Sequence, residues 1–344
     1  MNPIMTSLIL SSLALGTVIT LTSFHWLLAW IGLELNTLAI IPIITKQHHP
    51  RGTEATTKYF LTQAAASAML LFSSTINAWS TGTWDITQLT SQPACIMLTM
   101  ALSMKLGLAP LHFWLPEVLQ GTSLKTALII TTWQKLAPMA LLFLTQHALN
   151  PTTLLTMGLL STFVGGWGGL NQTQTRKIMA FSSIAHLGWM ATILTISPTI
   201  MILNLVLYLL MTTSMFTVLI FTTSKTIKDL TTTWTISPTL SSLTLILLMS
   251  LGGLPPLTGF MPKWLILQEL TSHNLPSLAT ILALSALLSL FFYLRLSYTM
   301  ALTLPPTTTQ NQLKWRFCPK QKTTVLSTTL VLSALLLPTT PLFL

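Results

Sequence analysis

The sequence predicts an all-α polytopic membrane protein with about 11 transmembrane helices arranged as two inverted five-helix repeats. Three observations lead to this prediction. Only 6% of the 344 residues are charged and 51% are hydrophobic, whereas a soluble domain carries about 25% charged residues. Mean hydropathy is +0.70. Many apolar stretches are long enough to cross a bilayer, and two of them are interrupted by the same glycine- and proline-containing motif.

Windows of about 20 apolar residues, the length that crosses a bilayer, place the spans in order along the chain. They cover residues 3–23, 25–45, 59–80, 95–115, 122–145, 152–170, 178–197, 199–222, 238–268, 276–296 and 323–343. The connecting segments are too short for a soluble domain. No basic region precedes the first span, so we expect a mature helix there rather than a targeting peptide.

The charged residues predict which helix ends share a side of the membrane. An odd number of spans puts the N-terminus on one side, called face A, and the C-terminus on the other, called face B. Face B receives only Asp85 and Glu269, whereas face A has three acids, Glu54, Glu117 and Asp229, and all basic loop residues. These are Lys46, Arg51, Lys58, Lys125, Arg176, Lys177, Lys225, Lys228, Arg295, Lys314, Arg316, Lys320 and Lys322. The positive-inside rule makes face A the cytoplasmic or matrix side.

The fourth and ninth spans carry matching motifs, GLAPLHFWLPE at Gly107–Glu117 and GLPPLTGFMPK at Gly253–Lys263, identical at five of eleven positions. As one helix, residues 239–270 would measure about 48 Å, against a hydrocarbon core of about 30 Å. We therefore expect unwound backbone at 254–259. Such paired interruptions are typical of transporters built from repeats. The alternative is two ordinary proline kinks, which membrane helices tolerate.

The two motifs lie five spans apart, and an odd offset means that they cross the membrane in opposite directions. We therefore expect a first repeat at 1–145, an inverted second repeat at 152–296, and a loop with a last helix at 297–344. The motifs end differently, in Glu117 and Lys263, so the repeat is expected to be symmetric in geometry but not in charge.

Four charged residues remain inside the apolar spans: Glu34, Lys105, Lys135 and Lys263. A charge near the bilayer centre costs roughly 2.5–3.5 kcal/mol on insertion scales. A lysine in a low-dielectric site can load and release a proton reversibly, so these residues predict a proton path. The alternative is a structural Glu34–Lys105 ion pair, with the other two lysines reaching an interface.

Two histidines, His186 in FSSIAHLGWM and His112 in the first interrupted motif, are candidate proton relays. The alternative for each is a helix–helix hydrogen bond. Cys95 and Cys318 are far apart and have no metal-binding spacing. The sequence contains no motif for a nicotinamide, a flavin or an iron–sulfur cluster. Its basic loop residues gather on one face of the membrane, which accounts for the positive charge, so we expect no nucleic-acid partner.

These motifs together resemble the antiporter-like membrane subunits of respiratory complex I, in the vertebrate mitochondrial form. The matching strings are GLELN around Glu34, SMKLGLAPLHFWLPEVLQG around Lys105, WQKLAP around Lys135, TRKIMAFSSIAHLGWM around His186 and GGLPPLTGFMPKW around Lys263. The resemblance covers the whole chain. Bacterial members carry additional N-terminal helices, which lie outside the repeat and have no counterpart in this sequence. The sequence also has no counterpart of the long lateral helix found in the largest antiporter-like subunit.

The resemblance implies a non-redox subunit that takes part in proton translocation across the mitochondrial inner membrane, coupled to electron transfer from NADH to ubiquinone. It makes Glu34 and Lys105 a charge-pair switch, Lys135 the central carrier, Lys263 the terminal residue towards the exit, and face A the matrix side. NADH, FMN, iron–sulfur clusters and ubiquinone would be held by other subunits. Partners would be antiporter-like, small core and accessory membrane-arm subunits, with lipids that include cardiolipin.

Two other functions are compatible with a polytopic membrane protein. A stand-alone cation/proton antiporter would need its own cation site, ideally a mid-membrane carboxylate besides Glu34, and none is present. A structural scaffold that does not pump protons would have little use for three lysines inside apolar spans, because each is costly to insert.

Overall fold

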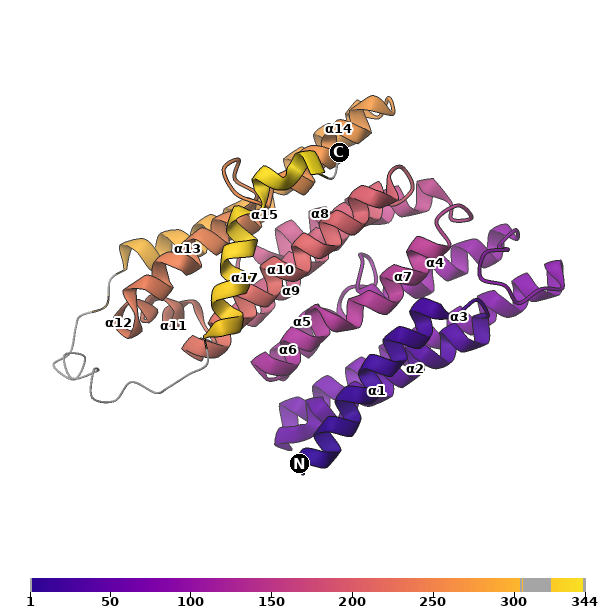
Figure 1. The fold of residues 1–344 in the computed structure, drawn as a ribbon, viewed down its shortest axis with the longest axis horizontal. Coiled ribbons are helices and arrows are strands. Elements are labelled where there is room, and N and C mark those ends of the chain that lie inside the picture. Colours follow the sequence, from indigo (N-terminus) through magenta and orange to yellow (C-terminus); the bar gives the residue numbers. More distant parts are fainter. Residues whose placement is uncertain (1, 304, 306–322, 343–344) are drawn as a thin grey trace.

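The computed structural model describes residues 2–303, 305 and 323–342. Throughout this part of the chain the regular structure is helical. Most helices lie side by side along a common direction, and the chain runs from an N-terminus at one end of the bundle to a C-terminus towards the other (Figure 1). Six of the described helices are long and apolar enough to cross a membrane. The predicted all-α, multi-pass membrane class is confirmed.

The first half of the chain contains seven α-helices and two 3₁₀ turns. They are α1 (Pro3–Thr22), α2 (Trp26–Ile44), η1 (Thr45–Gln47), α3 (Pro50–Thr81), α4 (Gln92–Leu106), α5 (Trp114–Gly121), α6 (Leu124–Thr131), η2 (Trp133–Lys135) and α7 (Leu136–Leu144). The second half follows with α8 (Pro151–Gly169), α9 (Thr175–Ile193), α10 (Pro198–Thr222), α11 (Ile227–Thr231), α12 (Thr233–Ile236), α13 (Pro238–Gly252), α14 (Phe260–Ser272), α15 (Pro276–Leu302), α17 (Thr324–Leu335) and η4 (Leu337–Leu342).

The packing pattern of the first half recurs in the second. Helix α1 packs on α2 as α8 packs on α9, α3 packs on α4 and α5 as α10 packs on α13 and α14, and α7 packs on α1 as α15 packs on α8. Both leading pairs approach closely at glycine. A Cβ atom on Gly16 would lie 2.8 Å from the carbonyl oxygen of Gly32, and one on Gly158 would lie 3.0 Å from that of Gly188. Small residues permit such close helix contacts in membranes.

Both predicted helix interruptions are present, and the same residue type ends the helix in each. Helix α4 stops before Gly107 (φ 81°) and α13 stops before Gly253 (φ 78°). This left-handed conformation costs glycine little, because it has no Cβ atom. The Gly107 amide donates to the Ser103 carbonyl at 2.8 Å, and the Gly253 amide donates to the Ser250 carbonyl at 3.0 Å. The chain becomes helical again at α5 and α14.

A third interruption, which the sequence analysis did not predict, divides the expected span 122–145. Helix α6 ends at Thr131, a 3₁₀ turn covers Trp133–Lys135, and α7 begins at Leu136. Pro138 explains the interruption: it has no amide hydrogen to donate to the carbonyl of Gln134, and its ring would clash with that carbonyl in a regular α-helix. The predicted span is present as Leu124–Leu144, but it is not regular α-helix throughout, and Lys135 lies at the break.

Two other predicted spans have different boundaries. Helix α3 begins at Pro50 rather than at residue 59, because the His49 ring accepts a hydrogen bond from the Arg51 amide at 3.1 Å and caps the helix. The last predicted span, 323–343, ends as α-helix at Leu335 and continues as 3₁₀ helix, where Pro338 lacks an amide hydrogen. Several predicted face-A or loop residues lie outside the described part: Lys314, Arg316, Cys318, Lys320 and Lys322.

Segments assigned to the same face contact one another. On face A, the Thr175 amide donates to the Lys225 carbonyl at 3.1 Å, and Arg295 Nη1 donates to the Leu170 carbonyl at 2.6 Å. On face B, the Trp26 amide donates to the Trp84 carbonyl at 3.1 Å. The grouping of loops by charge therefore agrees with their grouping in space.

Candidate functional site

Lys105 and Lys135 line the same small internal chamber. Lys105 lies in the last turn of α4 and Lys135 in the 3₁₀ turn before α7, and their side chains are only 5% and 4% exposed. About 10 Å³ of the chamber accepts the centre of a water molecule, which is room for about one water. The other polar lining residues are Asn36, Thr37, Tyr59, Gln63 and Gln134.

Several polar atoms of the chamber make no hydrogen bond to protein atoms in the described part of the chain. They are Nζ of Lys105 and both amide atoms of the Asn36 side chain. Buried polar groups are normally paired, with protein atoms or with water. These atoms are therefore available to form hydrogen bonds with water in the chamber.

Glu34 is connected to this chamber through Thr37. Glu34 is half-buried on α2, and Thr37 Oγ1 donates a hydrogen bond to its Oε2 at 3.0 Å. In the described structure, Glu34 and Lys105 do not form an ion pair within 4.0 Å. The structural ion pair considered from the sequence is therefore not formed, and the two residues are connected by way of the polar chamber.

Lys135 is connected to His186 through Tyr208 of α10. Lys135 Nζ donates a hydrogen bond to Tyr208 Oη at 3.2 Å and lies 5.2 Å from the centre of its ring. Tyr208 Oη in turn donates to the Thr131 carbonyl at 2.9 Å. The Tyr208 ring also lies 5.7 Å from the ring of His186, which is buried. The sequence analysis missed Tyr208, because a tyrosine in an apolar span has no local signal.

Lys263 folds back onto the second helix interruption. Its Nζ donates to the Gly252 carbonyl at 2.8 Å, and its side chain lies against Gly253. This hydrogen bond fixes the Lys263 side chain at the interruption. Its ammonium group is placed at the C-terminal end of α13, where the helix dipole is negative.

This placement adds a similarity between the two interruptions that the aligned motifs do not show. Lys105 belongs to the last turn of α4, so it also lies at the C-terminal end of a half-helix. Each interruption therefore has one lysine at the negative end of its first half-helix. The two lysines come from different sequence positions, one before the break and one after it, which is why a gap-free alignment did not match them.

His112 lies between α4 and α5 but does not line the chamber. It is buried, its Nδ1 has no hydrogen-bond partner among the described residues, and it lines a separate cavity of about 470 Å³. Glu117, Gln172 and Lys177 share this cavity. His112 is therefore separated from the chamber and lies beside face-A charges.

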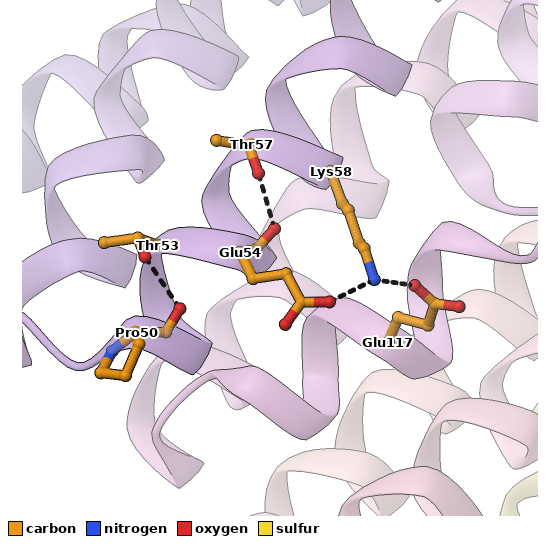
Figure 2. A network of polar contacts seen from close by, with 6 residues as sticks. All are labelled: Pro50, Thr53, Glu54, Thr57, Lys58 and Glu117. Atoms are coloured by element: carbon orange, nitrogen blue, oxygen red, sulfur yellow. Dashed lines mark hydrogen bonds and ion pairs between the residues drawn. The ribbon is translucent and has the colours of Figure 1, made fainter.

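An ion-pair network holds the end of the first interrupted helix on face A. Lys58 Nζ lies 2.6 Å from Glu54 Oε1 and 2.6 Å from Glu117 Oε2, so it joins α3 to α5 (Figure 2). All three side chains are largely exposed, and exposed pairs contribute little to stability. The network positions α5 relative to α3 and neutralises Lys58.

Comparison with known proteins identifies the family. Residues 23–289 match the family model described as NADH:quinone oxidoreductase/Mrp antiporter, transmembrane region, and residues 290–344 match the one described as NADH dehydrogenase subunit 2 C-terminus. The chain belongs to the NADH:quinone oxidoreductase/Mrp antiporter family. The resemblance inferred from the sequence motifs is confirmed.

Curated members of the family are similar to this chain over almost their whole length. NADH-ubiquinone oxidoreductase chain 2 of Xenopus laevis is 61% identical, with 99% of each chain covered. The protein of the same name from Latimeria chalumnae is 57% identical, over 99% of this chain and 98% of the relative.

Solved structures show the same fold. A chain of respiratory complex I from Thermus thermophilus, solved with bound aureothin, is 28% identical with a TM-score of 0.84, over 97% of this chain and 79% of that one. A chain of the Mrp complex from a Dietzia species has a TM-score of 0.74 at 16% identity, over 85% of this chain and 59% of that one. At 16% identity, the match to the Mrp complex supports the fold only.

Proposed function

We propose that this chain is a core membrane-arm subunit of respiratory complex I and takes part in moving protons across the mitochondrial inner membrane. The relatives named NADH-ubiquinone oxidoreductase chain 2 support the assignment to this complex. One structural observation carries the proton-transfer role: Lys105 and Lys135 share one buried polar chamber, and Tyr208 connects Lys135 to His186. The chain acts without redox chemistry, and NADH, FMN, iron–sulfur clusters and ubiquinone are held by other subunits.

The proposed path begins at Glu34 and Thr37, passes Lys105 and Lys135, and continues by His186 towards Lys263. Lys105 and Lys135 line the same low-dielectric space, so two ammonium groups there repel each other. A proton that arrives at Lys105 therefore favours release from Lys135. Tyr208 holds the Lys135 amine on the side of His186, which directs the released proton to the second half of the molecule.

Quinone reduction elsewhere in the complex would act on this path through Glu34. A negative Glu34 near the chamber stabilises the charged form of Lys105, and a shift of Glu34 or a change in its charge removes that stabilisation. Coupling of this kind is a linkage between two equilibria. The Thr37 hydrogen bond gives Glu34 a defined position from which it can be displaced.

We further propose that face A and the N-terminus lie in the matrix and that the C-terminus lies on the intermembrane-space side. In this arrangement residues 1–145 and 152–296 are inverted repeats, and 297–344 form a matrix loop and last helix. The recurring packing pattern, the close glycine contacts at Gly16 and Gly158, and the contacts among face-A loops support this proposal.

Other membrane-arm subunits, including antiporter-like, small core and accessory subunits, are the proposed protein partners, and lipids that include cardiolipin surround the rest. Outward-facing apolar side chains support such surroundings: the Trp79 side chain is 92% exposed. In water these surfaces would be unfavourable, because exposed apolar area costs free energy.

Replacement of Lys135 by methionine tests the function. Lys135→Met removes the proton carrier but keeps a long side chain, so the complex should assemble and proton translocation per electron should fall. Lys228→Met, on the exposed part of α11, is the matched control and should leave translocation unchanged. The measurement is proton uptake or release against NADH oxidation in sealed vesicles. Normal stoichiometry in Lys135→Met would contradict the proposal.

A further inference from the structure

A second cavity, of about 660 Å³, opens beside face A between the α1–α2 pair and helices α6 and α10. Its wall is apolar and comes from four different helices: Ile9 on α1, Ile43 on α2, Ile129 on α6 and Ile220 on α10. The volume falls within the range of about 300–1,000 Å³ that is typical of small-molecule sites. The cavity does not include any of the buried lysines of the proposed proton path.

The rim of this cavity is positive and has no carboxylate to balance it. Lys46, His49 and Lys125 line the rim, and no aspartate or glutamate lines the cavity. Within the described structure, neither Lys46 nor Lys125 forms a salt bridge. Lys58, on the same face, is different, because it contacts two glutamates at 2.6 Å each (Figure 2).

The rim also has two hydroxyls beside the cations, from Ser123 and Thr126 at the start of α6. Thr126 Oγ1 already donates to the Ser123 carbonyl at 2.8 Å, so Ser123 is the hydroxyl left to donate to a ligand. His49 Nδ1 is occupied by the Arg51 amide at 3.1 Å, so its remaining ring nitrogen, Nε2, is the one left to bind a ligand. A cluster of cations and hydroxyls of this kind suits the oxygens of a phosphate group.

We infer that this cavity binds an anionic phospholipid, with the phosphate between Lys46 and Lys125 and an acyl chain along the isoleucine wall. Basic pockets between transmembrane helices on the cytoplasmic or matrix side bind anionic lipid head groups. A free phosphate ion would use the rim but not the apolar wall. An apolar segment of another protein would use the wall but would leave two lysines uncompensated.

Photolabelling of the intact complex tests this inference without any mutation. The purified complex is placed in phosphatidylcholine nanodiscs that contain a small fraction of phosphatidylglycerol with a diazirine in its acyl chain. A phosphatidylcholine probe with the same diazirine is the comparison. After illumination, the anionic probe should label the Ile9 or Ile129 peptide at least fivefold more than the neutral probe. Equal labelling, or cross-links from these peptides to another subunit, would overturn the inference.

Charge-removing variants then locate the head group. Attraction of a basic residue near the surface to anionic lipid is about 1 kcal/mol, so Lys46→Gln and Lys125→Gln should each reduce the preference for the anionic probe about fivefold, and both together about 25-fold. Lys228→Gln, on the same face but outside the cavity, should change nothing. Unchanged preference in the double variant would refute the site. Loss of labelling on addition of millimolar glycerol 3-phosphate would show a small-phosphate site instead.

Discussion

At the scale of single residues, Tyr208 is the group that joins the two halves of the candidate site. It is almost fully buried, accepts a hydrogen bond from Lys135 Nζ, donates one to the Thr131 carbonyl and lies against His186. A hydroxyl can both accept and donate, so Tyr208 can hold an amine and relay its proton. Lys135 is thereby oriented by a residue from the second half of the chain.

Tyr208→Phe should slow proton translocation without preventing assembly. Loss of the hydroxyl leaves Lys135 without its side-chain partner, and a misplaced transfer group commonly costs one to two orders of magnitude in rate, here about tenfold or more. The measurement is the initial rate of NADH-driven proton translocation in vesicles. Tyr298→Phe, whose tyrosine is 67% exposed, is the control and should behave like the unmodified protein. An unchanged rate in Tyr208→Phe would show that Lys135 needs no such partner.

Gly253→Ala should be more harmful than an alanine at another left-handed glycine. Gly253 and Gly82 have similar φ angles, 78° and 73°, so both substitutions carry a backbone cost of roughly 1–2 kcal/mol. Only at Gly253 would the new Cβ atom meet Lys263, at 2.9 Å from Nζ, whereas nothing lies within 4 Å at Gly82. We expect a lower unfolding temperature for both and impaired proton translocation for Gly253→Ala alone. Equal translocation in the two variants would contradict the role of this contact.

At the scale of elements, three helix interruptions place the three lysines of the apolar spans. Two result from left-handed glycines, Gly107 and Gly253, and the third from Pro138. Each interruption exposes backbone polar groups inside the bundle, which is tolerated only where protein or a wet cavity surrounds them. The helices are therefore interrupted next to the three lysines, whose charged side chains need polar surroundings.

Pro138→Ala should restore a continuous helix through Lys135 and weaken proton transfer. Alanine supplies the missing amide hydrogen and removes the clash with the carbonyl four residues earlier. Amide hydrogen exchange of residues 132–138 should become slower, while proton translocation falls because Lys135 changes its direction. Pro42→Ala, at a proline inside the continuous helix α2, is the control and should leave translocation unchanged. A repaired helix with normal translocation would disprove the functional role of the break.

At the scale of the whole molecule, the two halves repeat one packing scheme and contact each other through α5, α6, α9 and α10. The chamber lies in the first half, and Tyr208 and His186 belong to the second. The proposed proton path crosses their interface at the Lys135–Tyr208 contact. In the proposed inverted arrangement, each half would form a half-channel that faces a different side of the membrane.

The sidedness predicts which positions a membrane-impermeant maleimide can reach. In a background without Cys95 and Cys318, a cysteine in place of Lys228 should react only from the matrix side, and one in place of Ser272 only from the intermembrane-space side. The two positions lie in exposed segments on faces A and B. The measurement is labelling in mitochondria with intact inner membranes against inverted vesicles. The reverse pattern would overturn the assigned orientation.

Most of the fold was predictable from the sequence, because its main determinants are local. Apolar length indicates the membrane spans, and charge segregation groups the loops that lie together. Gly107 and Gly253 could be found because glycine ends helices through its own backbone freedom. The boundary of α3 and the break at Pro138 were missed, because a helix cap and a tolerated proline depend on small local differences that hydropathy does not detect.

What the sequence determined by itself was the chemistry available: four charges in apolar spans, two matching helix interruptions and a basic face. Which of these groups meet was decided by the tertiary structure. Lys135 and Tyr208 are 73 residues apart, Asn36 and Gln134 reach the chamber from different helices, and Glu34 is connected to Lys105 without touching it. These contacts depend on how helices pack against one another, and packing depends on side chains that are distant in the sequence.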